Sequence, residues 1–196
     1  MNEREIEQYL IDFHKKELPK LLERDLKIPP TRKIKVLIGP RRAGKTFYIY
    51  QLMQELKNNQ KNFLFLNFEN TKLFDIKFKE IREIINLNDR IFPLVENKPV
   101  LFLDEPQNID FWERAVRELF DEGYNIFISG SSSKLLSKEI FTSLRGRSLS
   151  YLLLPFSFKE FIRIKNYKFH KWLSSEERLT LLKLIDEYLR FGGFPE

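Results

Sequence analysis

The sequence has no cysteine and only two histidines, His14 and His170, among its 196 residues. Without cysteine the chain can form no disulfide framework, no thiolate nucleophile and no Cys-type zinc site, and two histidines are too few for a His-based metal cage. Long apolar runs are also missing, since none approaches the roughly 20 residues of a membrane helix. The first residues lack the basic-then-apolar order of a signal peptide, so we expect no membrane partner and a cytoplasmic location.

Glycine is scarce too, with seven residues where an average usage of about 7% would give roughly twice as many. Each glycine that is present therefore needs a reason in the backbone, such as a tight turn or a close approach. Apolar residues are plentiful, at 42% of the chain, and charged residues make up 32%. This composition predicts one globular domain, or one domain with a small appendage.

Short apolar runs alternate with helical patterns along most of the chain. Five runs predict buried strands: 34–38, 63–68, 100–103, 126–129 and 149–154. Between them, apolar residues recur at helical spacing from Lys45, around Phe78 to Ile85 and from Trp112, and Gly123 is placed as a helix C-cap. Strands that alternate with amphipathic helices indicate an α/β fold, with a parallel sheet covered on both faces.

The two ends of the chain have a different texture. Residues 3–26 predict one or two helices interrupted near Pro19, and the chain after Pro155 predicts helices only, over 157–164 and 174–191. The second of these opens with the capping box Ser174 to Glu177. We therefore expect an N-terminal helical segment (1–30), an α/β core (31–156) and a helical lid region (157–196).

One motif stands between the first predicted strand and helix. Its residues are Gly39, Pro40, Arg41, Arg42, Ala43, Gly44, Lys45 and Thr46, followed by Phe47. They match the pattern G-x-x-x-x-G-K-[ST], in which backbone N–H groups and the helix N-terminus surround a phosphate. Lys45 is then expected to reach the β and γ oxygens of a nucleotide, and the Thr46 hydroxyl to bind Mg²⁺. Arg41 and Arg42 either add positive potential at the phosphates or are solvated charges beside the loop.

A pair of acids ends the third predicted strand. Asp104 is placed to hold Mg²⁺, and Glu105, aimed elsewhere by the alternation of a strand, to orient or deprotonate a water molecule. The serine-glycine-glycine signature of transporter ATPases is missing. So is the Asn-Lys-x-Asp motif of guanine-nucleotide switches, because Asn97-Lys98 precedes a strand and lacks the acid.

Taken together, the motifs resemble a group of archaeal and bacterial AAA-type P-loop ATPases from about Ile34 to the end. The segments that carry the resemblance are 39–46, 103–107 with 111–112, 129–133, 144–147, 154–161 and 192–196. The resemblance implies an additional-strand core with five parallel strands in the order 5-1-4-3-2, followed by a small helical lid. Members usually continue into a nuclease-like domain, so we expect a truncated lid and a missing C-terminal domain.

The resemblance also implies two further site residues. Ser131, or its neighbours Ser129 and Ser132, corresponds to the sensor hydroxyl, although a serine run after a strand can equally cap a helix. Arg147, with Arg145 second, corresponds to an arginine finger that can act in trans within a homo-oligomer. The alternative for these arginines is a basic loop that contacts solvent or nucleic acid. Glu69 is similar to an acidic position that faces Glu105 or the water.

The function expected from these features is hydrolysis of ATP with Mg²⁺, which drives a conformational change in an attached domain or partner. Two alternatives stay open: an ATP-dependent switch without hydrolysis, and a DNA-binding module regulated by ATP. DNA is considered because residues 131–171 carry nine Lys and Arg against two Glu, interleaved with aromatic residues. The biological substrate and the oligomeric state do not follow from the sequence.

Overall fold

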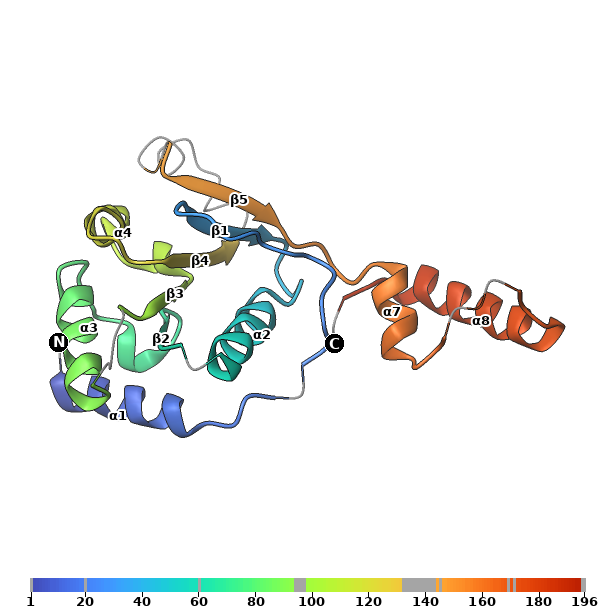
Figure 1. The fold of residues 1–196 in the computed structure, drawn as a ribbon, viewed down its shortest axis with the longest axis horizontal. Coiled ribbons are helices and arrows are strands. Elements are labelled where there is room, and N and C mark those ends of the chain that lie inside the picture. Colours follow the sequence, from blue (N-terminus) through green and yellow to red (C-terminus); the bar gives the residue numbers. More distant parts are fainter. Residues whose placement is uncertain are drawn as a thin grey trace.

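The computed structural model describes residues 2–19, 21–59, 61–93, 98–131, 144, 146–168, 170 and 172–194. It contains a five-stranded sheet formed by β1 (Ile34–Gly39), β2 (Phe63–Asn67), β3 (Val100–Asp104), β4 (Ile126–Ser131) and β5 (Ser148–Leu152). The strand order is β2-β3-β4-β1-β5, and every pairing is parallel (Figure 1). Read from the other edge, this is the expected order 5-1-4-3-2, and the predicted fold class is confirmed.

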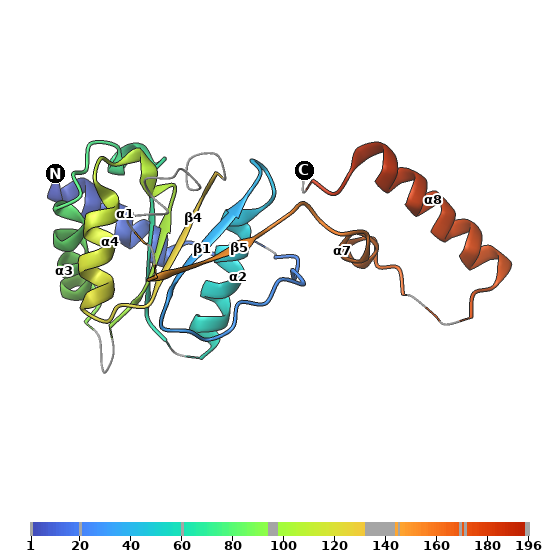
Figure 2. The same cartoon turned by 90° about the horizontal axis from the view of Figure 1, so that it is seen from above.

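Helices cover both faces of the sheet (Figure 2). On one face lies α2 (Lys45–Asn58), whose Tyr48, Ile49 and Met53 pack on Phe102 in one apolar cluster. On the other face lie α3 (Glu80–Ile91) and α4 (Trp112–Asp121), whose apolar stripes form a second cluster with Leu101 and neighbouring strand residues. All residues of β1 and β3 are buried because both of their faces are covered, which explains their continuous apolar runs.

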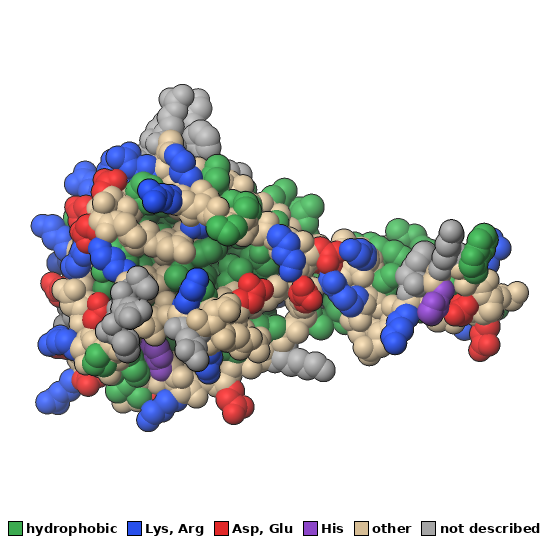
Figure 3. All heavy atoms as spheres, viewed as in Figure 1, with side chains coloured by type: hydrophobic (Ala, Val, Ile, Leu, Met, Phe, Trp, Pro, Cys, Tyr) green, Lys and Arg blue, Asp and Glu red, His purple; other side chains and the backbone are tan. Residues whose placement is uncertain are grey.

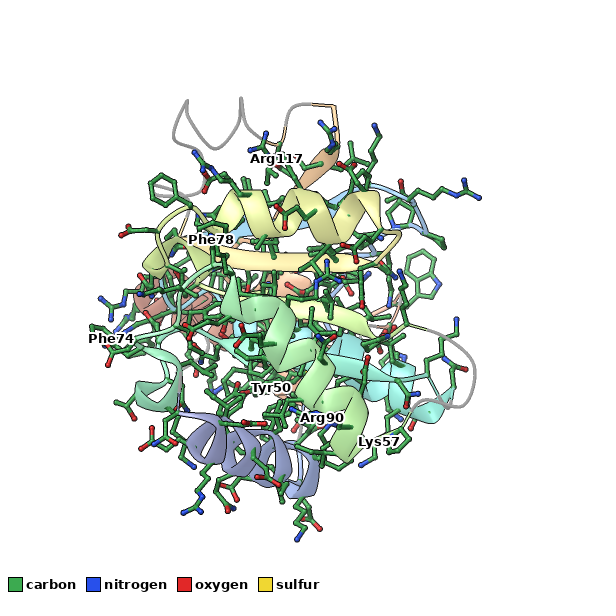
Figure 4. All side chains as sticks on the ribbon, turned by 90° about the vertical axis from the view of Figure 1, so that its left-hand side faces the viewer. Tyr50, Lys57, Phe74, Phe78, Arg90 and Arg117 are labelled. Atoms are coloured by element: carbon green, nitrogen blue, oxygen red, sulfur yellow. The ribbon has the colours of Figure 1, made fainter. Side chains whose placement is uncertain are left out.

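The edge strand β2 is covered by α1 (Glu3–Lys15). The Tyr9 hydroxyl donates a hydrogen bond to the Phe65 carbonyl (3.2 Å) and accepts one from the Asn67 N–H (3.1 Å). Two backbone groups of the strand edge are therefore satisfied by one side chain. Helix α1 also contacts α3, where Arg90 forms an ion pair with Glu3 of α1 at 2.9 Å. Figure 4 shows Arg90 on the side of α3 nearest α1.

Of the one or two N-terminal helices expected, one forms. It ends at Lys15, and in the described part of 16–33 the chain runs without a helix along α2. Two of its backbone groups bind side chains of α2: Gln51 Oε1 accepts from the Arg24 N–H (3.1 Å) and the Tyr48 hydroxyl donates to the Leu26 carbonyl (2.9 Å). These contacts satisfy two of the backbone groups that a helix would otherwise pair.

After β5 the chain leaves the core and forms an arm of two helices, α7 (Phe158–Ile164) and α8 (Ser175–Phe191) (Figures 1 and 2). Both helices begin with complete capping boxes, at Ser157 with Glu160 and at the predicted pair Ser174 with Glu177. No residue of α8 is buried, and apolar side chains are exposed along the arm and over β5 (Figure 3). Within the described residues, no helix is both long enough and apolar enough to span a bilayer.

Candidate nucleotide site

The predicted phosphate loop joins β1 to α2 at the carboxyl end of the sheet. Gly39 is the last residue of β1, and a Cβ built on it would lie only 2.1 Å from the Leu153 carbonyl oxygen, so no larger residue fits. Gly44, just before α2, has φ +87°, a conformation that favours glycine. These two glycines are thus required for different reasons, one by close approach and the other by the backbone angle.

The loop between them curls tightly. Arg42 also has a positive φ, +65°, and the Ala43 N–H donates to the Pro40 carbonyl at 3.3 Å. A turn that combines left-handed residues with a helix N-terminus directs successive N–H groups toward one point, which is the geometry of an anion-binding nest. The side chains of Arg41, Arg42 and Phe47 are exposed around this turn.

Lys45 begins α2 and turns back over the loop. Its Nζ donates to the carbonyls of Gly39 (3.0 Å) and Pro40 (2.9 Å), and the residue is only 8% exposed. Burial lowers the pKa of Lys45, and the negative charges of Glu105, Asp104 and Glu69 oppose that shift. The ammonium group is therefore held inside the loop by carbonyl oxygens, close enough to these three carboxylates to feel their charge.

Asp104 ends β3 and is 3% exposed. Its Oδ2 accepts a hydrogen bond from the Thr46 hydroxyl at 2.9 Å, and its Oδ1 accepts one from the Ser129 hydroxyl. The sheet register explains the second contact, because Asp104 lies opposite Ser129 on β4. Burial raises the pKa of Asp104 to about 6, and the hydrogen bonds from Ser129 and Thr46 oppose the shift without cancelling it.

Thr46 and Asp104 are the two residues predicted to hold a metal ion. Both offer oxygen ligands, the type that Mg²⁺ prefers, and their hydrogen bond places those oxygens side by side at the helix start. Mg²⁺ usually keeps several water ligands and takes only one or two from the protein. This donor set therefore fits Mg²⁺ bound together with phosphate oxygens.

Glu105 differs from Asp104 in both backbone and contacts. It has φ +53°, so the chain leaves the strand conformation at this residue before η2 (Pro106–Asn108), and its N–H donates to the Ser129 carbonyl at 2.7 Å. The Gln107 side-chain amide donates to its Oε2. A non-glycine residue held in the left-handed region is uncommon and is found at functional sites more often than elsewhere.

The structure describes the side chain of Ser129 but not those of the other two predicted sensor serines. Ser129 is fully buried and bonded to Asp104, so its hydroxyl is already engaged. The Ser131 backbone pairs with Gly39, which places the residue beside the phosphate loop, but its side chain lies outside the described residues, as does Ser132.

Glu69, after β2, is exposed and close enough for its charge to affect the pKa values of Lys45 and Asp104.

The predicted arginine finger lies elsewhere. Arg147 precedes β5, and its carbonyl accepts from the Ile34 N–H at 2.8 Å, at the amino ends of the strands. The phosphate loop follows the carboxyl end of β1, so Arg147 and the loop of its own chain are at opposite ends of the sheet. The Arg147 side chain contacts Asp121 of α4 at 3.4 Å. Arg145 lies outside the described residues, together with much of the basic stretch 131–171.

Two residues near the loop were not predicted individually. Gln107 stands in a motif that supported the resemblance, yet only the structure shows its contact with Glu105. Arg24 donates to the Ala43 carbonyl of the loop at 2.9 Å, and nothing in the sequence around Arg24 indicates this contact. The closest available signal was the capping box that marks its acidic partner, Glu160.

Comparison with known proteins finds relatives that match most of this chain. The uncharacterized protein MJ1544 of Methanocaldococcus jannaschii is 46% identical over 178 residues, which cover 90% of this chain and 39% of that protein. An uncharacterized protein of Haemophilus influenzae is 34% identical over 179 residues, 89% of this chain and 42% of that protein. The chain therefore spans about two fifths of the length of these curated relatives.

Among solved structures, that of C. elegans PCH-2 is similar to this chain with a TM-score of 0.46 and 16% identity, over 89% of this chain and 50% of that one. The AAA domain family matches residues 31–162, which take in all five strands and the start of the arm. This match confirms the resemblance that the motifs carried, and the chain belongs to the AAA domain family.

Proposed function

We propose that this protein binds ATP with Mg²⁺ at the loop 39–46 and hydrolyses it. The observation that carries the proposal is the contact of Thr46 with Asp104, beside a lysine folded into a glycine-bounded turn at a helix N-terminus. Family membership supports a P-loop nucleotide site in general. The arrangement of these side chains supports a site equipped for a triphosphate.

Binding is assigned to the loop and the start of α2. The curled backbone of residues 40–44 presents N–H groups to the β-phosphate, and the helix N-terminus adds its positive end. Lys45 exchanges its bonds to the Gly39 and Pro40 carbonyls for bonds to the β and γ oxygens. Thr46 and Asp104 would hold Mg²⁺, which supplies neutralisation of the charge on the phosphate oxygens.

Hydrolysis is assigned to Glu105. In this step a water oxygen forms a bond to the γ-phosphorus, the bond from that phosphorus to the β–γ bridging oxygen breaks, and ADP leaves with the electron pair. Glu105 takes the proton that the water loses. Gln107 fixes the orientation of Glu105 through its amide, and the left-handed backbone turns the carboxylate away from the strand.

Energy from this reaction is proposed to move the arm and whatever is attached to it. Helix α7 of the arm begins five residues after Leu153, the residue that crowds Gly39, so a change in the loop has a short path to it. Assembly into a homo-oligomer is also part of the proposal, because Arg147 can serve as a finger only for a neighbouring chain.

The proposal is tested by calorimetric titration with ATP, with and without Mg²⁺, followed by a phosphate-release assay. Lys45→Ala removes a charge-assisted hydrogen bond worth about 1.5–3 kcal/mol, so its Kd for ATP should rise about 10- to 100-fold. Lys57→Ala is the control, since it removes an exposed lysine (labelled in Figure 4) from the last turn of the same helix, at the opposite end from the loop.

Equal ATP affinity in wild type and Lys45→Ala would overturn the assignment of the site. Binding of ATP by wild type without phosphate release, in the presence of Mg²⁺ and at high protein concentration, would replace the ATPase by an ATP-dependent switch. The two results concern different halves of the proposal and are distinguished by the two assays.

A further inference from the structure

Arg24 lies deep between the core and the arm although it belongs to neither. It comes from the N-terminal segment that runs along α2 and is 5% exposed. Three of its side-chain nitrogens donate hydrogen bonds in three directions: Nε to Glu160 Oε1 (2.9 Å), Nη1 to the Ala43 carbonyl (2.9 Å) and Nη2 to the Leu154 carbonyl (2.6 Å). One guanidinium group therefore connects the phosphate loop, the chain after β5 and helix α7.

Glu160 is the residue of α7 that binds Arg24. It is 5% exposed and closes the capping box of α7, where its Oε2 accepts from the Ser157 N–H at 2.8 Å. Its Oε1 also accepts from the Asp25 N–H at 2.8 Å. Burial alone would raise the pKa of Glu160, but these hydrogen bonds and the charge of Arg24 outweigh burial and lower it. The first turn of α7 is thus tied to Arg24 by an ionised pair.

The chain between β5 and α7, residues 153–157, forms a hinge segment that contacts both sides. On the core side, the Leu153 N–H donates to the Ile38 carbonyl (2.7 Å) and the Leu153 carbonyl crowds Gly39. On the arm side, the Phe156 N–H donates to the Gly193 carbonyl (2.6 Å). The guanidinium of Arg24 lies 4.5 Å from the centre of the Phe156 ring.

The geometry of arginine makes these contacts interdependent. A guanidinium group is planar and rigid, so its three donors cannot move separately. A displacement of the Ala43 carbonyl when the loop takes up phosphates would change the position of the same group that holds Leu154 and Glu160. Stability alone gives a weak reason for the arrangement, because a buried ion pair offsets its own desolvation and apolar residues of similar size often serve as well.

We propose that Arg24 is a positioning residue that couples occupancy of the phosphate loop to the orientation of the arm, with Glu160 as the partner that transmits the change to α7. The inference rests on the proposed function, since it requires that the loop bind a nucleotide. It adds a route, from loop to guanidinium to helix cap, that does not pass through the sheet.

The route can be tested on the full chain by energy transfer between two dyes. Because the sequence has no cysteine, Lys57→Cys on α2 and Lys183→Cys on α8 introduce two unique and exposed attachment points. Transfer efficiency is measured without nucleotide and with saturating ATP, and ATP affinity is measured by calorimetry on the same samples. We expect ATP to change the transfer efficiency in the otherwise unmodified chain.

Arg24→Lys keeps the charge but loses the planar group with three donors. We expect this variant to bind ATP within about tenfold of the parent and to lose at least half of the ATP-dependent change in transfer efficiency. Arg163→Lys is the matched control on α7. Arg163 also binds the N-terminal segment, at Asp25 Oδ1 and the Glu23 carbonyl, but through contacts at the surface. This control should keep the full ATP-dependent change.

If Arg24→Lys does not fold, Glu160→Gln provides the second variant, because the amide keeps an oxygen for Arg24 but loses the charge. An ATP-dependent change that persists in full in these variants, or that is absent from the parent despite ATP binding, would overturn the inference and leave the proposed function intact. Failure of the parent to bind ATP would instead overturn the proposed function itself.

Discussion

Two neighbouring acids at the end of β3 have different surroundings. Asp104 is enclosed and receives two hydroxyl hydrogen bonds, whereas Glu105 is partly exposed and receives an amide from Gln107. The difference begins in the backbone, because Asp104 is still in the strand and Glu105 has turned into the left-handed region. Each acid therefore supports a separate prediction.

Replacing Glu105 by Gln should leave ATP binding nearly unchanged and reduce phosphate release strongly. A positioned general base contributes about 10²- to 10⁴-fold to a rate, and the amide cannot accept the proton of the attacking water. The measurement is steady-state phosphate release at saturating ATP and Mg²⁺, with Glu113→Gln on α4 as a control. An undiminished rate in Glu105→Gln would remove Glu105 from the mechanism.

Replacing Asp104 by Asn should change how the stability of the metal-free protein depends on pH. Since the folded state holds the Asp104 proton up to about pH 6 while the unfolded chain releases it near 3.8, ionisation favours the unfolded state. The contribution of Asp104 to stability is thus greatest below pH 3.8 and is lost as the pH rises through 6. Asn does not ionise and escapes this loss.

The free energy of unfolding of Asp104→Asn should therefore increase relative to that of wild type as the pH rises from about 4 to about 7, by up to about 3 kcal/mol. Denaturant titrations of both proteins at several pH values, in the presence of a chelator, measure the difference. Comparing the two proteins cancels the effects of the other carboxylates. A difference that stays constant over this range would contradict the raised pKa.

At the scale of single residues, the sequence pointed to those members of the candidate site that belong to a local motif. Lys45, Thr46 and Asp104 are examples, since loop spacing and strand position are local features. Arg24 could not be predicted in this way, because its partners Ala43, Leu154 and Glu160 are far from it in the chain. Contacts of that kind arise from the tertiary fold and leave no trace in periodicity.

Among the elements, α1 has a specific task at the edge of the sheet. Edge strands expose unpaired N–H and C=O groups, and α1 covers β2 with the Tyr9 hydroxyl bonded to both Phe65 and Asn67. Burial raises the pKa of the Tyr9 hydroxyl, so it stays neutral and can both donate and accept. Helix α1 therefore supplies hydrogen-bond partners for this edge of the sheet.

Tyr9→Phe should lower the free energy of unfolding by about 1–3 kcal/mol, because the ring still packs but the buried Phe65 carbonyl and the partly buried Asn67 N–H lose their partner. Chemical denaturation followed by far-UV circular dichroism measures this loss. Hydrogen exchange should in addition become faster at the Asn67 amide, while amides in β1, at the centre of the sheet, report only the global change. Unchanged exchange at Asn67 would contradict the assigned role.

The elements themselves were largely predictable because the sheet is parallel. Strands buried on both faces need continuous apolar runs, and the runs at 34–38 and 100–103 lie within β1 and β3. The N-terminal segment was harder, since its apolar residues pack on α2 without a helix. There, side chains of another element satisfy the backbone, and a sequence pattern alone does not record that.

On the scale of the whole molecule, the placement of Arg147 bears on assembly. Its side chain is 42% exposed at the amino ends of the strands, at the opposite end of the sheet from the phosphate loop. A role for Arg147 in hydrolysis therefore requires that a second copy bring this end against the first copy's loop. Assembly and turnover would then depend on each other.

Arg147→Ala should leave ATP affinity unchanged and lower the rate of phosphate release by up to about 10³-fold, the lower range for an arginine finger. The rate per chain of the wild type should also rise with protein concentration. Asp121→Ala is the matched control, because it removes the same surface ion pair without removing the arginine. A wild-type rate per chain independent of concentration, and equal to that of Arg147→Ala, would exclude a finger in trans.

The two ends of the arm meet at one place, because Phe156 at its start is bonded to Gly193 beyond its last helix. The contacts described above between the arm and the rest of the chain also gather at this end, at Glu160 and Arg163 of α7, so a rotation of the arm would pivot here and move the far end of α8 most. The 17 residues of α8 extend about 25 Å at 1.5 Å per residue, so a rotation of about 5° at the pivot displaces the far tip by roughly 2 Å. If the arm turns when the loop binds a nucleotide, as proposed above, a small rotation beside the loop would become a motion large enough for a bound protein to detect.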